Sequence, residues 1–283
     1  MQFKTLSNGV ELPMIGYGTF QIKDAAQCEQ CVLEALEAGY RLFDTAASYE
    51  NEAAVGAALR SSGLPWEAWF VTTKLWVQDA GYDGTLKAFD HSLRQLGLDH
   101  MDLYLIHQPF GDYYGAWRAM ERLYREGAVR AVGVSNFTPE RLVDLCMNQE
   151  LKPMVNQIEI HPFFQQKEAL RVMEDYDVVP QAWGPLSEAQ KHIFHHKTLA
   201  RIADRHGKTT AQVILRWHFQ RGIPTIPKTV HQDRMAENLD IFDFELTEKE
   251  MESIAGMDIG HSEIIDHHCF CTARQLNSVK IHG

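Results

Sequence analysis

The chain of 283 residues is 45% hydrophobic and carries a formal net charge of −11 at pH 7. Its length fits one barrel of eight strand–helix units, which takes about 250 residues, or two average domains. The negative charge argues against binding to nucleic acid or to an anionic membrane. No apolar stretch approaches the roughly 20 residues of a transmembrane helix, and the first residues lack the apolar core of a secretory signal, so we expect a cytoplasmic protein.

The first 13 residues predict a β-hairpin. Asn8-Gly9 separates two short strand-like runs, at 3–6 and 10–12, and the Asn-Gly pair favours a type I′ turn. We expect residues 1–13 to form a lid on the bottom of the domain that follows.

Strand-like and helix-like segments alternate after the hairpin. The strand-like segments cover residues 14–18, 41–44, 69–74, 103–107, 129–134, 154–158, 178–183 and 223–227. The helix-like segments cover residues 25–38, 51–61, 85–96, 116–126, 140–147, 167–176, 209–219 and 232–239. This alternation is typical of a parallel sheet, and eight units predict an α/β protein with a closed (β/α)8 barrel, or TIM barrel. We therefore expect a single domain over residues 1–283.

The end of the chain adds one helix and a tail. A helix is predicted over residues 247–255, where Thr247 and Glu250 have the spacing of a capping box. Residues 258–283 are rich in His and predict an irregular tail.

The five cysteines show no spacing typical of a disulfide framework. Cys28-x-x-Cys31 could be a redox pair or half of a metal site, but both cysteines fall at helical spacing among apolar residues, which favours two buried thiols. The segment 267–271, His-His-Cys-Phe-Cys, also has metal-ligand types. Two such clusters at opposite ends of the chain make a weak case, and we predict no metal site.

Asp44, Lys74 and His107 each end one of the apolar strand-like runs. In a (β/α)8 barrel the carboxyl ends of all strands open onto one face, where the chemistry takes place. Tyr49, five residues after Asp44, can join them. The sequence therefore predicts a carboxylate, an ammonium, an imidazole and a phenol close together.

This quartet suits reduction of a carbonyl, which needs a hydride at carbon and a proton at oxygen. Tyr49 could donate the proton, although its ordinary pKa of about 10 is high for transfer near neutrality. An ammonium at Lys74 would stabilise the phenolate and lower that pKa, with Asp44 as the counter-charge. His107 could donate a hydrogen bond to the carbonyl oxygen.

Each member of the quartet also has a structural explanation when taken singly. Asp44 could cap a turn, Lys74 could end a strand in solvent, His107 could be a core histidine, and Tyr49 could pack in the interior. Their joint placement at strand ends favours the catalytic interpretation.

Three segments resemble signatures of the aldo-keto reductase family. They are residues 39–49 (GYRLFDTAASY), 103–109 (LYLIHQP) and 226–229 (IPKT), which occur in the family's order. The similarity extends from the hairpin to about residue 257, and the chain is most similar to small bacterial members of the 2,5-diketo-D-gluconate reductase type.

The resemblance implies the activity and the roles of the quartet. It implies an NADP-dependent alcohol dehydrogenase or carbonyl reductase that reduces aldehydes and ketones with NADPH and functions as a monomer. Tyr49 would be the acid/base, and Asp44, Lys74 and His107 its partners.

A cofactor site is expected at the later strand ends. The sequence argues against a Rossmann domain, because Gly16-Tyr17-Gly18 is not followed by the third glycine of G-x-G-x-x-G. Trp183 offers a flat face for the nicotinamide ring, and the segment 184–187 offers backbone N–H groups to a pyrophosphate; a core Trp and an ordinary turn are the structural alternatives. The cofactor contacts that the resemblance implies are Thr19, Ser135, Asn136, Gln157, Trp183, Gly184, Leu186, Ser187, Lys228, Thr229, Arg234, Glu237 and Asn238.

Two groups within that set have a chemical basis of their own. The hydroxyl and amides of Ser135, Asn136 and Gln157 suit the nicotinamide carboxamide. Lys228 and Arg234, beside a predicted helix N-terminus, suit a phosphate, although a solvated charged helix would show the same pattern. The resemblance makes this the site of the adenosine 2′-phosphate, which favours NADPH over NADH, with Glu237 and Asn238 on the adenine.

The substrate pocket departs from the family's pattern. Gln108 stands where the family usually has Trp, while Phe20 and Trp76 are expected as apolar walls. The tail, residues 258–283, is expected near the pocket and differs from that of close relatives. A small polar carbonyl compound, such as a ketoaldehyde or a sugar-derived ketone, is the predicted substrate.

Three other functions were weighed against the reductase. A cofactor-binding sensor or regulatory barrel with little turnover would keep the fold, but it would not require Tyr49 and Lys74. A metal-dependent barrel hydrolase needs carboxylate and histidine ligands on several strand ends, which the chain lacks. A serine hydrolase is disfavoured because Phe137 replaces the last glycine of G-x-S-x-G around Ser135.

Overall fold

A computed structural model describes residues 2–283. A two-stranded antiparallel sheet, β1 (Phe3–Thr5) with β2 (Glu11–Pro13), precedes a parallel sheet of seven strands in the order of the chain. The strands of the parallel sheet are β3 (Tyr17–Gly18), β4 (Leu42–Asp44), β5 (Phe70–Leu75), β6 (Met101–Ile106), β7 (Val129–Ser135), β8 (Val155–Glu159) and β9 (Val179–Trp183).

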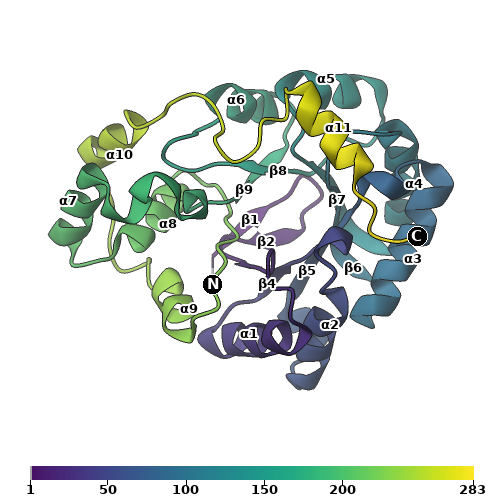
Figure 1. Ribbon diagram of the computed structural model, residues 1–283, viewed down its shortest axis with the longest axis horizontal. Coiled ribbons are helices and arrows are strands. Elements are labelled where there is room, and N and C mark those ends of the chain that lie inside the picture. The colour runs from purple at the N-terminus through teal and green to yellow at the C-terminus, as the bar shows by residue number, and fades with distance from the viewer. Residues whose placement is uncertain (1) are drawn as a thin grey trace.

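Helices surround the curled sheet, as Figure 1 shows. They are α1 (Ala25–Ala38), α2 (Glu52–Ser61), α3 (Tyr82–Leu96), α4 (Tyr113–Arg125), α5 (Pro139–Asn148), α6 (Lys167–Asp175), α7 (Lys197–His206), α8 (Thr210–Gln220), α9 (Gln232–Leu239), α10 (Glu248–Ala255) and α11 (Phe270–Ser278). Strands β4, β5, β6 and β8 are buried along their whole length. Such burial is expected of a parallel sheet that is covered on both faces.

Local sequence signals place several helices well. The predicted bounds of α1 and α9 match the structure, and α1 ends at Gly39, whose φ of 110° is a left-handed conformation that favours glycine. Thr247 and Glu250 form the expected capping box at α10. Cys28 and Cys31 are buried on α1, as the interpretation of two buried thiols requires. Helix α7 lies in a stretch where the sequence predicted no separate helix.

The hairpin is confirmed, but its predicted type I′ turn is wrong. Such a turn needs positive φ at both central residues, and of Asn8 and Gly9 only Gly9, at 85°, has it. The loop is longer than two residues, since Gly9 N–H donates to Leu6 and Leu6 N–H donates to Val10. Asn8 Nδ2 donates to the carbonyl oxygen of Arg130 at 2.9 Å, near the amino end of β7.

The predicted eighth strand, at 223–227, does not form a regular strand in the described chain. Thr225 makes only isolated parallel bridges, one to Ile15 and one to Ala182 of β9. The two prolines of the segment, Pro224 and Pro227, have no N–H to donate, which prevents a continuous ladder. The first predicted strand, at 14–18, is likewise reduced to the two residues of β3.

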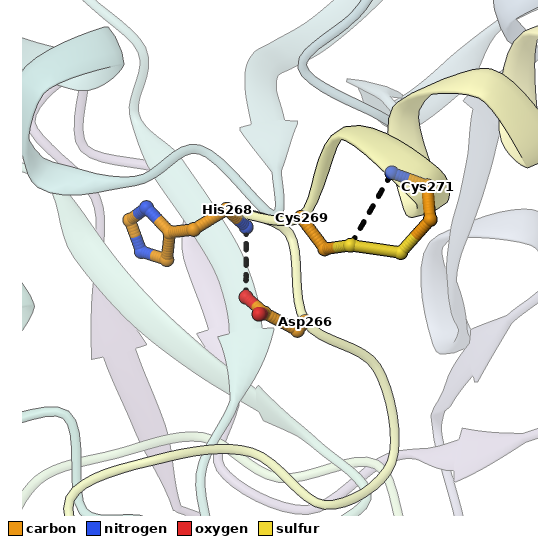
Figure 2. The surroundings of a disulfide bond; sticks show 4 residues. All are labelled: Asp266, His268, Cys269 and Cys271. Atoms are coloured by element: carbon orange, nitrogen blue, oxygen red, sulfur yellow. Dashed lines mark hydrogen bonds between the residues drawn. A yellow bond between two sulfur atoms is a disulfide. The ribbon is translucent and has the colours of Figure 1, made fainter.

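The tail is only partly irregular, because residues 270–278 form α11. Figure 2 shows a disulfide between Cys269 and Cys271 at the start of this helix, where Cys271 N–H donates to Cys269 Sγ. Neither the helix nor the disulfide was predicted from the sequence. A C-x-C pair falls outside the usual disulfide spacings, and the helix forms where the tail packs back on the domain.

Candidate active site

The quartet comes from three neighbouring strands and one short turn. Asp44 is the last residue of β4, Lys74 lies near the end of β5, and His107 follows β6 directly. The parallel register brings these strand ends to one edge of the sheet. Tyr49 ends the short 3-10 helix Ala47–Tyr49, which follows β4. The predicted convergence of the four side chains is therefore present.

Lys74 is the centre of the quartet. Its side chain is completely buried, and Nζ donates to Asp44 Oδ1 at 2.5 Å, to the carbonyl oxygen of Thr45 at 2.9 Å and to the Tyr49 hydroxyl at 3.3 Å. Three acceptors match the three protons of an ammonium. The second carboxylate oxygen of Asp44 accepts from Gln157 Nε2 at 2.7 Å, so the buried carboxylate has a partner on each oxygen.

Burial and charge oppose one another in setting the pKa values of this group. Burial raises the pKa of Tyr49, and the Lys74 ammonium opposes that shift without overcoming it. The predicted lowering by Lys74 is therefore present, but the net shift of the Tyr49 pKa is upward, because the phenol is more deeply buried than the sequence could show. Burial lowers the pKa of Lys74, but the Asp44 carboxylate and, to a smaller extent, the interaction with Tyr49 outweigh it and raise the pKa overall, which keeps the ammonium charged.

His107 is neutral and held by a residue that the sequence analysis missed. Burial, followed by the charge of Lys74, lowers the pKa of His107 well below its usual value. Ser48 Oγ lies 3.2 Å from His107 Nδ1. When Ser48 donates to Nδ1, the single ring proton is on Nε2, which is then available to donate to a ligand. The position of Ser48 beside Tyr49 was the only sequence signal for it.

A cavity of about 810 Å³ opens over the quartet, lined by Asp44, Tyr49 and His107, with Lys74 behind them. Eleven further residues from the sequence prediction also line it: Phe20, Trp76, Gln108, Ser135, Asn136, Gln157, Trp183, Gly184, Leu186, Lys228 and Arg234. One cavity thus joins a phenol beside a buried ammonium, a set of amides, an aromatic face and two cations.

The polar side chains at the later strand ends of this cavity form a hydrogen-bond network. Asn136 Nδ2 donates to the carbonyl oxygen of His107 at 2.9 Å, and Trp183 Nε1 donates to Asn136 Oδ1 at 2.8 Å. Ser135 Oγ donates to the carbonyl oxygen of Gln157 at 2.8 Å. These bonds orient the side chains before any ligand arrives, and they leave Gln157 Oε1 to accept from one.

Five predicted cofactor contacts do not line the cavity: Thr19, Ser187, Thr229, Glu237 and Asn238. Thr19 Oγ1 donates to the carbonyl oxygen of Asp44 at 3.0 Å, which supports the quartet from behind. Glu237 Oε1 accepts from Thr209 Oγ1 at 2.7 Å, and Asn238 is 4% exposed. The side chains of Thr19 and Glu237 are thus engaged within the protein, and that of Asn238 is buried.

The tail supplies cavity residues that the sequence could not identify, namely Ile264, Ile265, His267, Leu276 and Val279. Ser262 Oγ donates to Glu159 Oε2 at 2.6 Å, at the end of β8, and Trp76 Nε1 donates to the carbonyl oxygen of Val279 at 3.0 Å. The tail is therefore anchored on two sides of the cavity. No local signal links residues so far apart along the chain.

The described chain contains neither a metal cluster nor a membrane-spanning helix. Across residues 2–283, no three His, Cys, Asp or Glu side chains are grouped in a way that could hold a metal ion. Over the same part of the chain, no helix has the length and apolar character needed to cross a membrane.

Comparison with known proteins agrees with this geometry. Residues 14–259 match the family model described as the aldo/keto reductase family. A glyoxal reductase of Bacillus subtilis (strain 168) is 45% identical over 254 residues, which cover 89% of this chain and 91% of that protein. An aldo-keto reductase from a Medee basin deep-sea metagenome library, MGS-M4, is 42% identical, with a TM-score of 0.89 over 93% of this chain and 99% of its own.

A structure of the Gox0644 D53A mutant in complex with NADPH is also similar. It is 36% identical, with a TM-score of 0.89 and 98% coverage of both chains.

Proposed function

The chain belongs to the aldo/keto reductase family, and on this basis we propose that it is an NADPH-dependent reductase that converts small aldehydes and ketones to alcohols. The observation that carries the proposal is the placement of the Tyr49 hydroxyl 3.3 Å from the buried Lys74 ammonium, at the edge of a cavity of about 810 Å³. A phenol held beside a buried cation can lose its proton to an oxygen in the cavity.

The proton route follows from this chain's own residues. Bound NADPH would supply the hydride. His107 Nε2–H donates to the substrate carbonyl oxygen and directs it at Tyr49. Because its pKa is raised, Tyr49 keeps its proton until negative charge develops on that oxygen, and then transfers it. Lys74 stabilises the phenolate that is left, and Asp44 keeps Lys74 charged and in place.

The chemistry of the residues that line the cavity supports a nicotinamide cofactor there. We propose that Trp183 stacks on the nicotinamide ring and that Ser135, Asn136 and Gln157 bind its carboxamide. The backbone at 184–187 would contact the pyrophosphate, and Lys228 and Arg234 the adenosine 2′-phosphate. The stated preference for NADPH rests on these two cations, both of which line the cavity.

The remaining contacts from the sequence prediction take weaker roles in this proposal. Thr19 and Thr229 would act through the backbone around them, and Glu237 and Asn238 would reach the adenine only at the rim. Phe20, Trp76 and Gln108 would contact the substrate. A regulatory barrel without turnover finds no support, because all four members of the quartet are in place.

We also propose that the segment 223–227 acts as the eighth member of a closed barrel. Gly16 N–H donates to the carbonyl oxygen of Thr225 at 2.8 Å, and Ala182 N–H donates to that of Pro224 at 2.8 Å. The segment 223–227 thus forms backbone hydrogen bonds with residues next to β3 and in β9, the two edge strands of the sheet. A monomeric state and a cytoplasmic location stay predictions from the sequence.

The test is NADPH consumption with methylglyoxal as substrate. We expect turnover by the intact protein, and a fall in kcat of about 10²- to 10⁴-fold for Tyr49→Phe, because general acid catalysis contributes on that order. NADPH binding, followed by fluorescence, should be retained in the variant. Undiminished turnover by Tyr49→Phe would refute the proton route, and absence of turnover by the intact protein on any small carbonyl would refute the reductase.

A further inference from the structure

Gln108 forms an unusual polar contact with the tail. It follows His107 directly, lines the cavity and is only 7% exposed. Its Oε1 lies 3.0 Å from His267 Nε2, which belongs to the tail and lines the same cavity. Two polar side chains from distant parts of the chain therefore meet beside the quartet.

The tail holds His267 in a fixed place. The Ser262 bond to Glu159 and the Trp76 bond to Val279 anchor the tail before and after His267. Ser262 Oγ also accepts from the backbone N–H groups of Ile264 and Ile265, at 3.0 Å each. The meeting of His267 with Gln108 is thus a feature of a packed segment and not of a loose surface side chain.

The hydrogen bond between His267 and Gln108 determines how the Gln108 side-chain amide is oriented. An amide oxygen can only accept, so His267 Nε2 donates. Burial lowers the pKa of His267 to about 4, so the ring is neutral near pH 7 and its single proton lies on Nε2. Among residues 2–283, the Gln108 amide nitrogen has no hydrogen-bond partner. Its N–H groups are free to bind a ligand beside His107.

The apolar surroundings of the Gln108 amide allow it to discriminate between substrates. Trp76, Phe20 and Ile265 line the same cavity and are apolar. A purely apolar substrate would displace water from the Gln108 amide and leave buried donors unpaired, which costs free energy. A substrate with an acceptor at that point avoids the cost, and sites of this kind discriminate strongly against analogues that lack the acceptor.

We propose that the Gln108 amide, oriented by His267, binds a second oxygen next to the reacting carbonyl, and so selects 2-oxo and 2-hydroxy aldehydes over simple aldehydes. Gln108 is the specificity residue that contacts substrate, and His267 is a positioning residue that acts through it. This inference deepens the proposed reductase function and rests on it.

The test compares methylglyoxal with propanal, which has the same three-carbon skeleton without the second oxygen. For each protein the ratio of the two kcat/KM values is measured with NADPH. We expect the ratio to fall about tenfold in Gln108→Met, a side chain of similar length with no amide, because about one hydrogen bond is lost. The intrinsic reactivities of the two aldehydes cancel when the ratios of two proteins are compared.

The tail supplies a second variant and a matched control. His267→Leu should lower the ratio by a similar factor, and adding it to Gln108→Met should lower the ratio no further, because His267 acts through Gln108. His267→Gln, which keeps a donor, should restore part of the ratio. His268→Leu changes the neighbouring histidine, whose side chain is exposed, and should leave the ratio unchanged.

Each outcome bears on one proposal only. If both aldehydes are reduced and the ratio stays within twofold in Gln108→Met and His267→Leu, the inference is overturned and the reductase stands. If His267→Leu lowers the ratio further in a protein that already carries Gln108→Met, the positioning role of His267 is overturned. If the intact protein reduces neither aldehyde nor any other small carbonyl, the proposed function itself fails.

Discussion

At the scale of single residues, the buried Asp44–Lys74 pair is the feature on which both stability and the site depend. Each partner satisfies the other at 2.5 Å, and both side chains are almost completely buried. Two buried charges of opposite sign are tolerated only as a pair, since removal of one leaves the other without compensation.

We expect Lys74→Met to lower the free energy of unfolding by about 3–5 kcal/mol at pH 7, as for other broken buried pairs. Burial already raises the pKa of Asp44 despite Lys74, and with Asp44 buried alone its pKa would rise further in the folded state. The cost of burying a lone carboxylate disappears once that carboxyl is protonated. The variant should therefore regain stability relative to the parent as the pH falls toward about 4. Urea unfolding at several pH values measures this.

The double variant Asp44→Asn/Lys74→Met is the control for that experiment. With no lone charge left, it should be more stable than Lys74→Met at pH 7, and its stability should vary less with pH between 4 and 7. A single variant as stable as the parent would contradict the account of the pair.

Arg234 gives a second prediction at this scale. It is exposed, lies in the first turn of α9 and lines the cavity. If it binds the 2′-phosphate, Arg234→Ala should weaken NADPH binding about 10- to 100-fold, in line with the loss of a charge-assisted hydrogen bond, and should change NADH binding little. Fluorescence titration with both cofactors tests this, with the exposed Arg171→Ala as control. Equal losses for the two cofactors would exclude the role.

At the scale of elements, helix starts show how far local sequence governs this fold. The capping box of α10 joins Thr247 and Glu250, and Glu250 Oε1 also accepts from Arg205 Nη1 of α7 at 2.9 Å. The Glu250 side chain therefore caps the start of α10 and also links α10 to α7. Although burial raises the pKa of Glu250, the hydrogen bonds from Thr247 and His206 outweigh it and lower the pKa to about 2.

We expect Glu250→Gln to cost about 1–2 kcal/mol of stability at pH 7, as caps and charge-assisted bonds do. Because the pKa of Glu250 is lower in the folded protein than the ordinary value of about 4.5, its carboxylate stabilises the folded state at pH values above 4.5. That stabilisation is lost as the pH falls toward 2. The difference between parent and variant should therefore shrink below pH 4.5. Urea unfolding from pH 7 to 3 measures it, with Glu252→Gln, exposed on the same helix, as control. A constant difference over that range would contradict the assignment.

The tail illustrates the opposite case at this scale. Its sequence has no strong helical periodicity, yet residues 270–278 form α11 with Thr272 buried. The segment becomes helical where its residues Leu276 and Val279 meet the cavity. Tertiary contact supplies here what local propensity does not.

At the scale of the whole molecule, close approach between helices sets the packing around the sheet. Gly56 lies inside α2, where a Cβ atom would collide with the carbonyl oxygen of Leu96 at the end of α3. The backbones of the two helices touch at this point, and glycine is the residue that allows it. The position of each helix thus depends on its neighbour.

We expect Gly56→Ala to lower the free energy of unfolding by about 1–3 kcal/mol, the usual cost of overpacking, despite the better helix propensity of alanine. Gly256→Ala is the matched control. Gly256 has a φ of −72°, and a Cβ there would meet nothing closer than 3.7 Å. Its replacement should be neutral or slightly stabilising. Thermal unfolding of the two variants compares them, and equal stabilities would contradict the packing argument.

Signals in the amino-acid sequence were enough to predict the α/β alternation, most helix positions, the family and the convergence of Asp44, Lys74, His107 and Tyr49. These features follow from signals a few residues long, such as apolar periodicity, caps and polar residues at strand ends, because parallel strands bring their carboxyl ends to one edge.

Other features became visible only in the three-dimensional structure. It showed the irregular bridging at Thr225, the net rise in the pKa of Tyr49, the support of His107 by Ser48 and the contact of His267 with Gln108. Burial depth and contacts between distant segments arise from the packing of the whole chain, and a residue's sequence neighbours carry no record of them. Gln108 and His267 stand 159 positions apart, and only the fold brings them together.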